Sequence, residues 1–488
     1  MNGFESVLSG RVKGMRKMVH KHGKSTAFSC NARSKCSLSA IIWSLAAWIL
    51  LVHAYNTLTP SNFNREKSPM QGNHNHLSIY REYEEIEDRG FEVRQRGKKF
   101  VSPSGKQRGR RYTPIDDFLD VTSQRRSLYF PEKSLAVNPL KTDKDMHYFY
   151  PGREWCDTEG RPIQAHGGGI LFVEETQTFY WYGENKDGRT YHIHRKSTAR
   201  VDIIGVSCYS SKNLWAWKNE GIVLPGERDN KTHDLYVSNV LERPKVIYND
   251  RTKQYVMWMH IDIANYSKAS VGVAVSSSPT GPFHYLGSKR PHGFDSRDMT
   301  VFKDDNGEAY IVYSSEDNSE LHIGQLTEDY LDVTRIMRRN LVGEHREAPA
   351  VFKHRGLYYM ITSGCTGWAP NAALAHSAES MLGQWETLGN PCMGGNEDFR
   401  VTTFFAQGTF VVPLPGVPDT FIFMADRWNP ADLRDSRYVW LPLTMDGPAD
   451  EPLEDDFEFP LWSRVSIYWH KKWRLPEEWR LPLAQSKQ

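Results

Sequence analysis

The feature that most limits the possible folds is a pattern that occurs five times after about residue 146. In each copy a polar residue precedes an apolar run, a turn and an aromatic-rich run. The distances from the polar residue to the aromatic anchor are 13, 13, 12, 11 and 14 residues. Five hairpins of nearly equal length indicate a repeat protein. The copies begin at His166, Glu242, Asp298, Glu347 and Gln407.

The strand content of each repeat predicts how the copies are arranged. A further short apolar run follows each hairpin, as in GVSCYSS and SVGVAVSSS, and no long amphipathic helix interrupts the series. Repeats of three or four strands bury their faces only against their neighbours. We therefore predict an all-β fold, a five-bladed β-propeller over residues 146–450. A β-sandwich is the alternative, but it would not explain the matched polar residues.

The N-terminal region predicts a membrane anchor. Residues 38–55 carry no formal charge, and eighteen helical residues span roughly 27 Å, enough for a thin early-secretory bilayer. Eight basic side chains precede this segment, and the first charged residue after it is Arg65. The positive-inside rule then keeps residues 1–37 cytosolic. We expect a single N-terminal transmembrane helix of the signal-anchor type. A cleavable signal peptide is the alternative, although its apolar region would lie closer to the start.

The flanking regions are polar or rich in tryptophan. We predict a largely disordered lumenal stem over residues 56–145, and we treat residues 451–488 as a C-terminal extension. Eight basic residues between Arg94 and Arg111 are typical of a solvated linker, with binding of an anionic polymer as the alternative. Residues 146–488 hold 36 basic and 45 acidic side chains, a net charge of −9. This balance argues against a nucleic-acid-binding domain.

The cysteines and sequons of the predicted lumenal part agree with that compartment. An even number of cysteines in an oxidising space allows two disulfides in any of three pairings. The sequons at Asn230 and Asn265 are usable only on the lumenal side. The cysteines in question are Cys156, Cys208, Cys365 and Cys392.

In a propeller the five leading polar residues converge on one cavity. The innermost strand of every blade faces the central axis, so equivalent residues meet there. Three of the five are carboxylates, and burying them together is costly unless they are hydrogen-bonded, share protons or meet polar ligands. A functional site is therefore predicted, with a fold-stabilising hydrogen-bond network as the alternative.

Clustered carboxylates beside aromatic side chains suit glycoside hydrolysis. This reaction needs an acid to protonate the leaving oxygen and a partner to activate water. Asp298 would raise the pKa of a neighbouring Glu347 and keep it protonated. Trp368 and Trp428 follow the inner hairpins of the fourth and fifth blades and offer faces for sugar rings.

Other chemistries lack their motifs. The sequence contains no Ser-His-Asp elbow, phosphate loop, dinucleotide fingerprint or convincing zinc spacing, so neither a cofactor nor a metal is expected. The run Gly167–Gly169 lacks the strand-to-helix setting of a phosphate loop. A nucleotide-sugar transferase is disfavoured because Asp304-Asp305 falls in a predicted hairpin turn.

At these residues the chain resembles glycoside hydrolase family 43, a family of five-bladed inverting enzymes, over roughly residues 146–450. SRDMTVFKDDNGEAYIVYSS is similar to the segment whose aspartate tunes the acid, which implies that role for Asp298. EAPAVFKHRGLYYMITSG is similar to the general-acid segment, which implies that role for Glu347. The family's usual base aspartate in the first blade is replaced here by Ala165-His166-Gly167.

That departure, with QAHGGGILF, YWYGENKDG and TTFFAQGTF, resembles the branch of plant Golgi exo-β-1,3-galactosidases acting on type II arabinogalactan. The resemblance implies that Gln407 positions or activates water, with Glu242 as a second candidate for that role or as a ligand of the sugar hydroxyl at C2. Glu184 and His166 are implied to contact the sugar. It further implies a single-pass type II Golgi membrane protein with a lumenal catalytic domain.

Two rival functions stay open at this point. One is another exo-glycosidase of the same family, an arabinofuranosidase or xylosidase, because pocket shape selects the sugar. The other is a propeller that binds glycan without cleaving it, which the missing base in the first blade allows.

Overall fold

The computed structural model describes residues 113–141, 147–193, 198–417, 419–445, 465–476 and 479. The predicted cytosolic tail, the membrane segment at 38–55 and most of the predicted stem lie outside these residues. Within the described ranges, no helix combines the length and apolar character that a membrane crossing requires.

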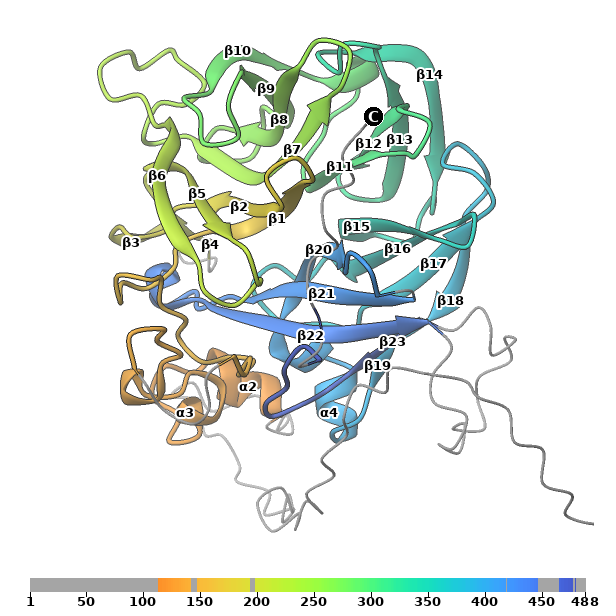
Figure 1. Cartoon of the computed structure of the whole chain (residues 1–488). Helices are drawn as coiled ribbons and strands as arrows, with labels where there is room; N and C mark the ends of the chain where they lie inside the picture. The colour runs from red at the N-terminus through yellow and green to blue at the C-terminus, as the bar shows by residue number, and fades with distance from the viewer. Residues whose placement is uncertain are drawn as a thin grey trace, which may run out of the picture. The chain divides into compact units, whose positions relative to one another are not determined.

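Five sheets surround a common axis, as the five-bladed prediction requires (Figure 1). Their strands pair antiparallel except for β19 and β23 of the fifth blade, which pair in parallel. The first four blades have four strands each, and a two-stranded hairpin of β3 and β4 branches from the first blade. The strands of the first two blades, from the axis outward, are β1 (His166–Val173), β2 (Thr178–Glu184), β5 (Gly205–Ser211) and β6 (Lys218–Pro225), then β7 (Val240–Asn249), β8 (Gln254–Asp262), β9 (Ser270–Ser276) and β10 (His284–Lys289). The side hairpin is β3 (Thr190–Ile193) and β4 (Thr198–Val201).

The third and fourth blades repeat this order. They contain β11 (Met299–Lys303), β12 (Ala309–Ser315), β13 (Glu320–Leu326) and β14 (Val333–Asn340), then β15 (Arg346–His354), β16 (Leu357–Gly364), β17 (Leu374–Ala378) and β18 (Glu386–Gly389). Short helical turns join some elements, namely η2 (Pro291–Gly293), α4 (Glu397–Arg400), η3 (Thr403–Phe405) and η4 (Leu433–Asp435).

Burial falls from the axis to the rim, which explains the sequence pattern of each repeat. Every residue of β12 is buried, whereas most of β14 is exposed or half-buried. The aromatic-rich second strands are covered on both faces by adjacent blades, so they read as continuous apolar runs. The outer strands have one wet face and carry charged side chains.

The fifth blade closes the ring and combines strands that precede its inner hairpin in the sequence with strands that follow it. Its order is β19 (Cys392–Met393), β23 (Val465–Tyr468), β22 (Arg437–Met445), β21 (Thr420–Arg427) and β20 (Gln407–Pro413). Strand β20 contacts the inner strands of both adjacent blades. Strand β23 comes from the predicted C-terminal extension, so part of that segment completes a blade.

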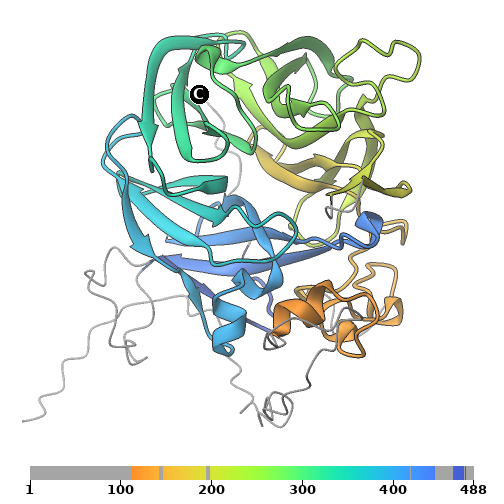
Figure 2. The ribbon, with the colours of Figure 1, turned by 180° about the vertical axis from the view of Figure 1, so that it is seen from behind.

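Part of the predicted stem is also folded. It forms α2 (Pro114–Leu119), α3 (Arg126–Tyr129) and η1 (Lys133–Leu135), which lie beside the fifth blade in both views (Figures 1 and 2). Phe118 and Tyr129 pack on Phe405 of that blade. The expectation of disorder as far as residue 145 therefore does not hold for residues 113–141, because these buried aromatic side chains anchor them.

Two further expectations meet the structure here. The four cysteines beyond the predicted membrane segment are free thiols, so none of the three disulfide pairings is formed. Three of these thiols are buried, Cys208 in β5, Cys392 in β19 and Cys156 in the segment before β1, while Cys365 is exposed. Both sequon asparagines, Asn230 and Asn265, lie in exposed turns.

Trp473 offers a test of how the chain ends support the fifth blade. Its ring stacks on Phe149 with centroids 4.3 Å apart, and its Nε1 donates to the carbonyl of Trp440 at 2.8 Å. Trp473→Ala should lower the free energy of unfolding by about 3–5 kcal/mol, the usual cost of emptying a buried aromatic site. Denaturant unfolding of the purified protein measures the change. Val342→Ala, at a side chain that is 66% exposed, is the control, and equal stability of the two variants would contradict this role.

Candidate active site

A β-bulge after the leading polar residue directs the start of the inner strands. Strands β1, β7 and β15 each carry one extra residue at this point relative to their partner strand. The residue that follows the leading one has a positive φ in all three, at Gly167 (59°), Arg243 (54°) and Ala348 (54°). Strand β20 has a similar register shift after Gly408. Bulges of this kind bend a strand and re-aim its side chains.

The second strands bring a matching set of polar residues to the same end of the blades. Four of them are the strand partners of the leading residue in their own blade, and the backbone N–H of Ser314 donates to the carbonyl of Asp298. All five are buried. They are Glu184, His260, Ser314, Ser363 and Asp426.

Arg243 connects the blades at the centre of this cluster. Its Nη2 lies 2.9 Å from Asp298 Oδ2 and donates to Gln407 Oε1 at 2.7 Å. Its backbone N–H donates to Glu184 Oε1 at 2.9 Å. Burial opposes the charge of the guanidinium, but Asp298 beside it raises the pKa of Arg243. The guanidinium thus links the second blade to the third and fifth, and the backbone of the same residue links it to the first.

Glu347 has the properties of a proton donor. Its Oε1 accepts a hydrogen bond from Gln407 Nε2 at 3.0 Å, and its Oε2 accepts a longer one from Asn318 Nδ2 at 3.4 Å. Burial, followed by the charge of Asp298, raises the pKa of Glu347 to about 8, with Arg243 opposing the shift. The carboxyl group is therefore mostly protonated at neutral pH, as a general acid must be.

The amide of Gln407 is fully hydrogen-bonded. Its Oε1 accepts from Arg243 and from Trp428 Nε1 at 3.1 Å. Its Nε2 donates to Glu347 and to Ser363 Oγ at 3.0 Å. Because Arg243 and Trp428 can only donate, they determine which way the amide points. Gln407 holds the acid in place, and both acceptor positions of its oxygen are occupied.

A second chain of ionisable groups begins at Glu242. Its Oε2 lies 3.1 Å from His260 Nδ1, and Tyr266 donates its hydroxyl to Oε1 at 2.7 Å. The other ring nitrogen of His260 lies 3.0 Å from Asp262 Oδ2. Burial acts against the charged forms, yet these hydrogen bonds raise the pKa of His260 to about 9 and lower the pKa of Glu242. Glu242 is therefore ionised at neutral pH.

The first blade supplies its carboxylate from the second strand. Glu184 Oε2 pairs with Lys186 Nζ at 2.6 Å, and burial raises the pKa of Glu184. A Cβ atom at Gly167 would lie 2.3 Å from Glu184 Oε1. The glycine therefore makes room for the Glu184 carboxylate to reach the Arg243 backbone.

His166 lies beside the site but not at its surface. Its side chain is fully buried, its Nδ1 lies 2.8 Å from Asp426 Oδ1, and its ring stacks on Tyr438 with centroids 4.8 Å apart. The predicted sugar contact therefore has no accessible atom at His166 in this structure. The two predicted tryptophans are half-buried and meet edge to face, with Trp368 and Trp428 centroids 5.7 Å apart.

A pocket of about 420 Å³ adjoins the cluster. Its walls combine charged and aromatic side chains, the residue types that suit a polar ligand with an apolar face. Trp368 links the pocket to the catalytic cluster, because it packs on Trp428, which donates to Gln407. The residues that matter here are Glu184, Lys186, Glu242, Tyr266 and Trp368.

Sequence reasoning found the inner-strand residues and missed most of their partners. Arg243, Lys186 and Tyr266 were not singled out, nor was Lys245, whose Nζ donates to the Gly167 carbonyl at 2.7 Å. A signal for the second ring was present in the repeat itself. Each aromatic-rich run has a polar residue at its last or next-to-last position, and these are the buried residues opposite the leading ones.

Comparisons with known proteins agree with this geometry. The model of the Glycosyl hydrolases family 43 matches residues 178–406. No curated protein sequence matches the chain.

Several solved structures are similar to this chain. A GH43 β-1,3-galactosidase, BT3683, with galactodeoxynojirimycin is 39% identical, with 67% of this chain and 100% of that chain covered and a TM-score of 0.59. An exo-β-1,3-galactanase from Phanerochaete chrysosporium with galactose is 39% identical, with 60% and 64% covered and a TM-score of 0.53. An exo-β-1,3-galactanase from Clostridium thermocellum is 34% identical, with 67% of each chain covered and a TM-score of 0.55.

The raised pKa of Glu347 predicts the alkaline limit of activity. A proton donor is lost as pH rises through its pKa, so kcat/KM should fall around pH 8. Asp298→Asn removes a negative charge that raises this pKa and leaves Arg243 unopposed, so the alkaline limb should move to lower pH. Gln407→Glu adds a negative charge beside Glu347 and should move the limb to higher pH.

The pH dependence of kcat/KM for the three proteins measures these shifts. Asp305→Asn is the control, since this 86% exposed carboxylate belongs to the same blade as Asp298 but lies in its β11–β12 turn. Its limb should coincide with that of the wild type. Shifts of the same sign for Asp298→Asn and Gln407→Glu would contradict the electrostatic account.

Proposed function

Since this chain belongs to glycosyl hydrolases family 43, we propose that it removes terminal β-1,3-linked galactose from type II arabinogalactan chains, with inversion at the anomeric carbon. It is a glycoside hydrolase of the galactosidase type. The observation that carries the proposal is the half-buried Glu347, whose pKa is raised to about 8 and which lies between Gln407 and Asn318 next to a polar pocket. Similar proteins described as β-1,3-galactosidases or exo-β-1,3-galactanases support the choice of sugar and linkage.

Glu347 acts as the general acid in this reaction. Its proton passes to the glycosidic oxygen while the bond from that oxygen to the anomeric carbon breaks. Oε1 is engaged by Gln407 at 3.0 Å, so Oε2, whose contact is longer at 3.4 Å, is the oxygen that presents the proton. Asp298 keeps the acid protonated and balances Arg243, so it supports the transfer without exchanging a proton itself.

Water attacks the anomeric carbon from the opposite face, and its proton must leave. Gln407 Oε1 accepts hydrogen bonds from Arg243 and Trp428, so it orients this water only when the water O–H replaces one of these donors. The bond from Trp428, at 3.1 Å, is the longer one and the easier to replace. A neutral amide is a weak base. Glu242 is the second candidate, because it is an ionised carboxylate at the pocket wall with His260 and Asp262 behind it.

We place the enzyme in the Golgi membrane, with its propeller in the lumen. The uncharged segment at 38–55 and the basic residues before it support this location. The two exposed sequon asparagines, Asn230 and Asn265, are accessible to lumenal glycosylation. Loss of endoglycosidase-sensitive glycan from Asn230→Gln and Asn265→Gln variants tests the topology, and an unglycosylated wild type would contradict it.

Product analysis tests sugar, linkage and stereochemistry together. NMR of a β-1,3-galacto-oligosaccharide incubated with the protein should show galactose released first as the α-anomer, the result of one inverting displacement. A panel of aryl arabinofuranosides and xylosides serves as the comparison. Release of arabinose or xylose without galactose would contradict the substrate, and glycan binding without any release would favour a non-catalytic role.

The acid role of Glu347 predicts a dependence on the leaving group. Glu347→Gln should lower kcat/KM for β-1,3-galactobiose by roughly 10²–10⁴-fold, the usual contribution of a general acid. A dinitrophenyl galactoside needs no protonation, so its hydrolysis should be far less affected. Glu344→Gln, an exposed neighbour, is the matched control. Equal losses on both substrates would show that Glu347 is needed for something other than proton donation.

A further inference from the structure

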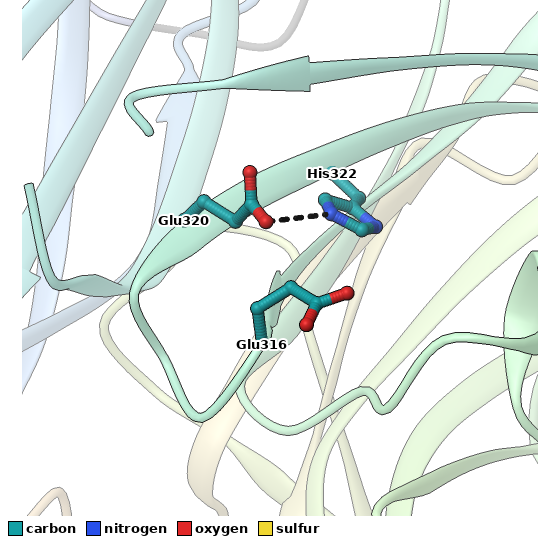
Figure 3. A group of neighbouring side chains, drawn as sticks. All are labelled: Glu316, Glu320 and His322. Carbon is teal, nitrogen blue, oxygen red and sulfur yellow. Dashed lines mark ion pairs between the residues drawn. The ribbon is translucent and has the colours of Figure 1, made fainter. Parts of the chain in front are cut away.

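Blade three carries a second cluster of metal-ligating side chains that the proposed reaction does not use. Glu316 follows β12, while Glu320 and His322 belong to β13 (Figure 3). One ligand atom from each of the three side chains lies within 4.8 Å of the other two. The β12–β13 turn brings the two glutamates to the same end of the blade as the His322 ring.

His322 is the observation that points to a ligand. Its side chain is fully buried, and neither ring nitrogen has a hydrogen-bond partner. The nearest acceptor, Glu320 Oε1, lies 3.6 Å from Nε2, beyond hydrogen-bonding distance. Phe294 and Tyr313 cover the ring edge to face, with centroids 4.9 and 5.3 Å away. A buried polar group left unpaired costs stability, and a cation at Nε2 would remove that cost for this one of the two nitrogens.

The charges around the cluster leave an excess of negative charge. Asp295 and Asp317 both pair with Arg297, and Glu320 pairs with Arg339. Among the described residues, Glu316 forms no ion pair of its own. Asp317 is 95% exposed and its charge is screened by solvent, so Asp295 and Glu320 are each balanced by one guanidinium group, while the negative charge of Glu316 stays unbalanced. A cation would compensate this charge.

Arg339 does not prevent a metal from binding Glu320. Its Nε donates to Glu320 Oε2 at 2.9 Å, and its Nη2 contacts Oε1. A carboxylate has about four lone-pair positions, so Oε1 has capacity for a metal while Oε2 keeps the Nε donor. Metal-bound carboxylates are commonly held by such a second partner.

We propose that Glu316, Glu320 and His322 form a binding site for a divalent transition-metal cation, with Zn²⁺ as the best match. One imidazole nitrogen and two carboxylate oxygens are ligands that Zn²⁺ accepts, whereas Ca²⁺ and Mg²⁺ prefer oxygen alone. Three protein ligands leave a coordination position for water. Glu316 reaches solvent and provides the route of entry.

A cation at this site would stabilise the turn that contacts the acid. Residues 316–318 all have positive φ, at 51°, 55° and 61°, a costly conformation for residues other than glycine. In the sequence Asn318 lies between the two glutamate ligands, and its side chain donates to Glu347 Oε2. The metal would therefore act on proton donation through the position of Asn318, a consequence that rests on the proposed function.

Zinc titration of the full-length protein tests the site without measuring activity. After metal is removed with a chelator, calorimetry should show a Zn²⁺ site in the wild type. The affinity of this site should fall by more than about tenfold in Glu316→Gln, because loss of even an outer-sphere partner typically lowers metal affinity by about 10–100-fold. Glu316 is partly exposed, so this variant should fold normally. Asp317→Asn is the matched control, because it removes the same charge from the same turn, and its side chain is 95% exposed.

The comparison between variants decides the outcome, because histidines elsewhere in the chain also bind Zn²⁺. Identical isotherms for the wild type and Glu316→Gln would overturn the site. Binding of Ca²⁺ or Mg²⁺ as tight as that of Zn²⁺ would overturn the choice of metal. His322→Gln should abolish the same component, and its circular dichroism spectrum shows whether the variant is folded.

The link to the acid has a separate readout. Zn²⁺ should change the alkaline limb of the pH profile in the wild type and in Asp317→Asn, but not in Glu316→Gln. If Zn²⁺ binds as expected and the limb stays in place, the coupling through Asn318 is wrong. Because binding is measured without substrate, its failure is distinguishable from failure of the proposed glycosidase activity.

Discussion

The geometry of the site depends on one buried cation, the guanidinium of Arg243. A buried charge must be paired, and breaking a buried pair typically costs 3–5 kcal/mol. Asp298 supplies the opposite charge and Gln407 an oxygen acceptor, so one group joins three blades. The planar guanidinium of an arginine suits this purpose because it offers several donors in fixed directions. The neighbouring cation, Lys245, donates instead to the Gly167 carbonyl and to Thr409 Oγ1. The positive φ of Arg243 in the β7 bulge is the backbone conformation that places it there.

Around this cation the carboxylates have different electrostatic environments. Glu347 has no cationic hydrogen-bond donor among its printed partners, the amides of Gln407 and Asn318 and the Cys365 thiol, and burial with the nearby charge of Asp298 favours its protonated form. Glu242 faces His260 and Tyr266, which favour its ionised form. Carboxylates whose pKa values are pushed apart in this way can divide the roles of acid and base. At the other cluster of blade three, the hydrogen bonds of Arg339 lower the pKa of Glu320.

The repeat pattern predicted the architecture because a strand has a period of two and a blade has a fixed strand length. A nearly equal spacing from the polar residue to the aromatic anchor places equivalent residues at similar heights, so the sequence predicts that Asp298, Glu347 and Gln407 converge on the axis. Arg243 was missed because the bulge in β7 breaks the alternation, and a charged residue directly after Glu242 reads as facing away from the axis. His166 was expected to face the sugar, but its pairing with Asp426 buries it.

The amino-acid order alone determined the number of blades, the inner strands and the chemical type of the central residues, since these depend on local periodicity and turn residues. The predictions of a membrane anchor at residues 38–55 and of two glycosylation sites also depend on the sequence alone. Only the tertiary structure decided that β23 completes the fifth blade, that residues 113–141 pack against the propeller, and that the cysteines stay unpaired. It also decided which polar groups meet across blades, because contacts such as that of Arg243 with Gln407 join residues 164 positions apart and follow from ring closure.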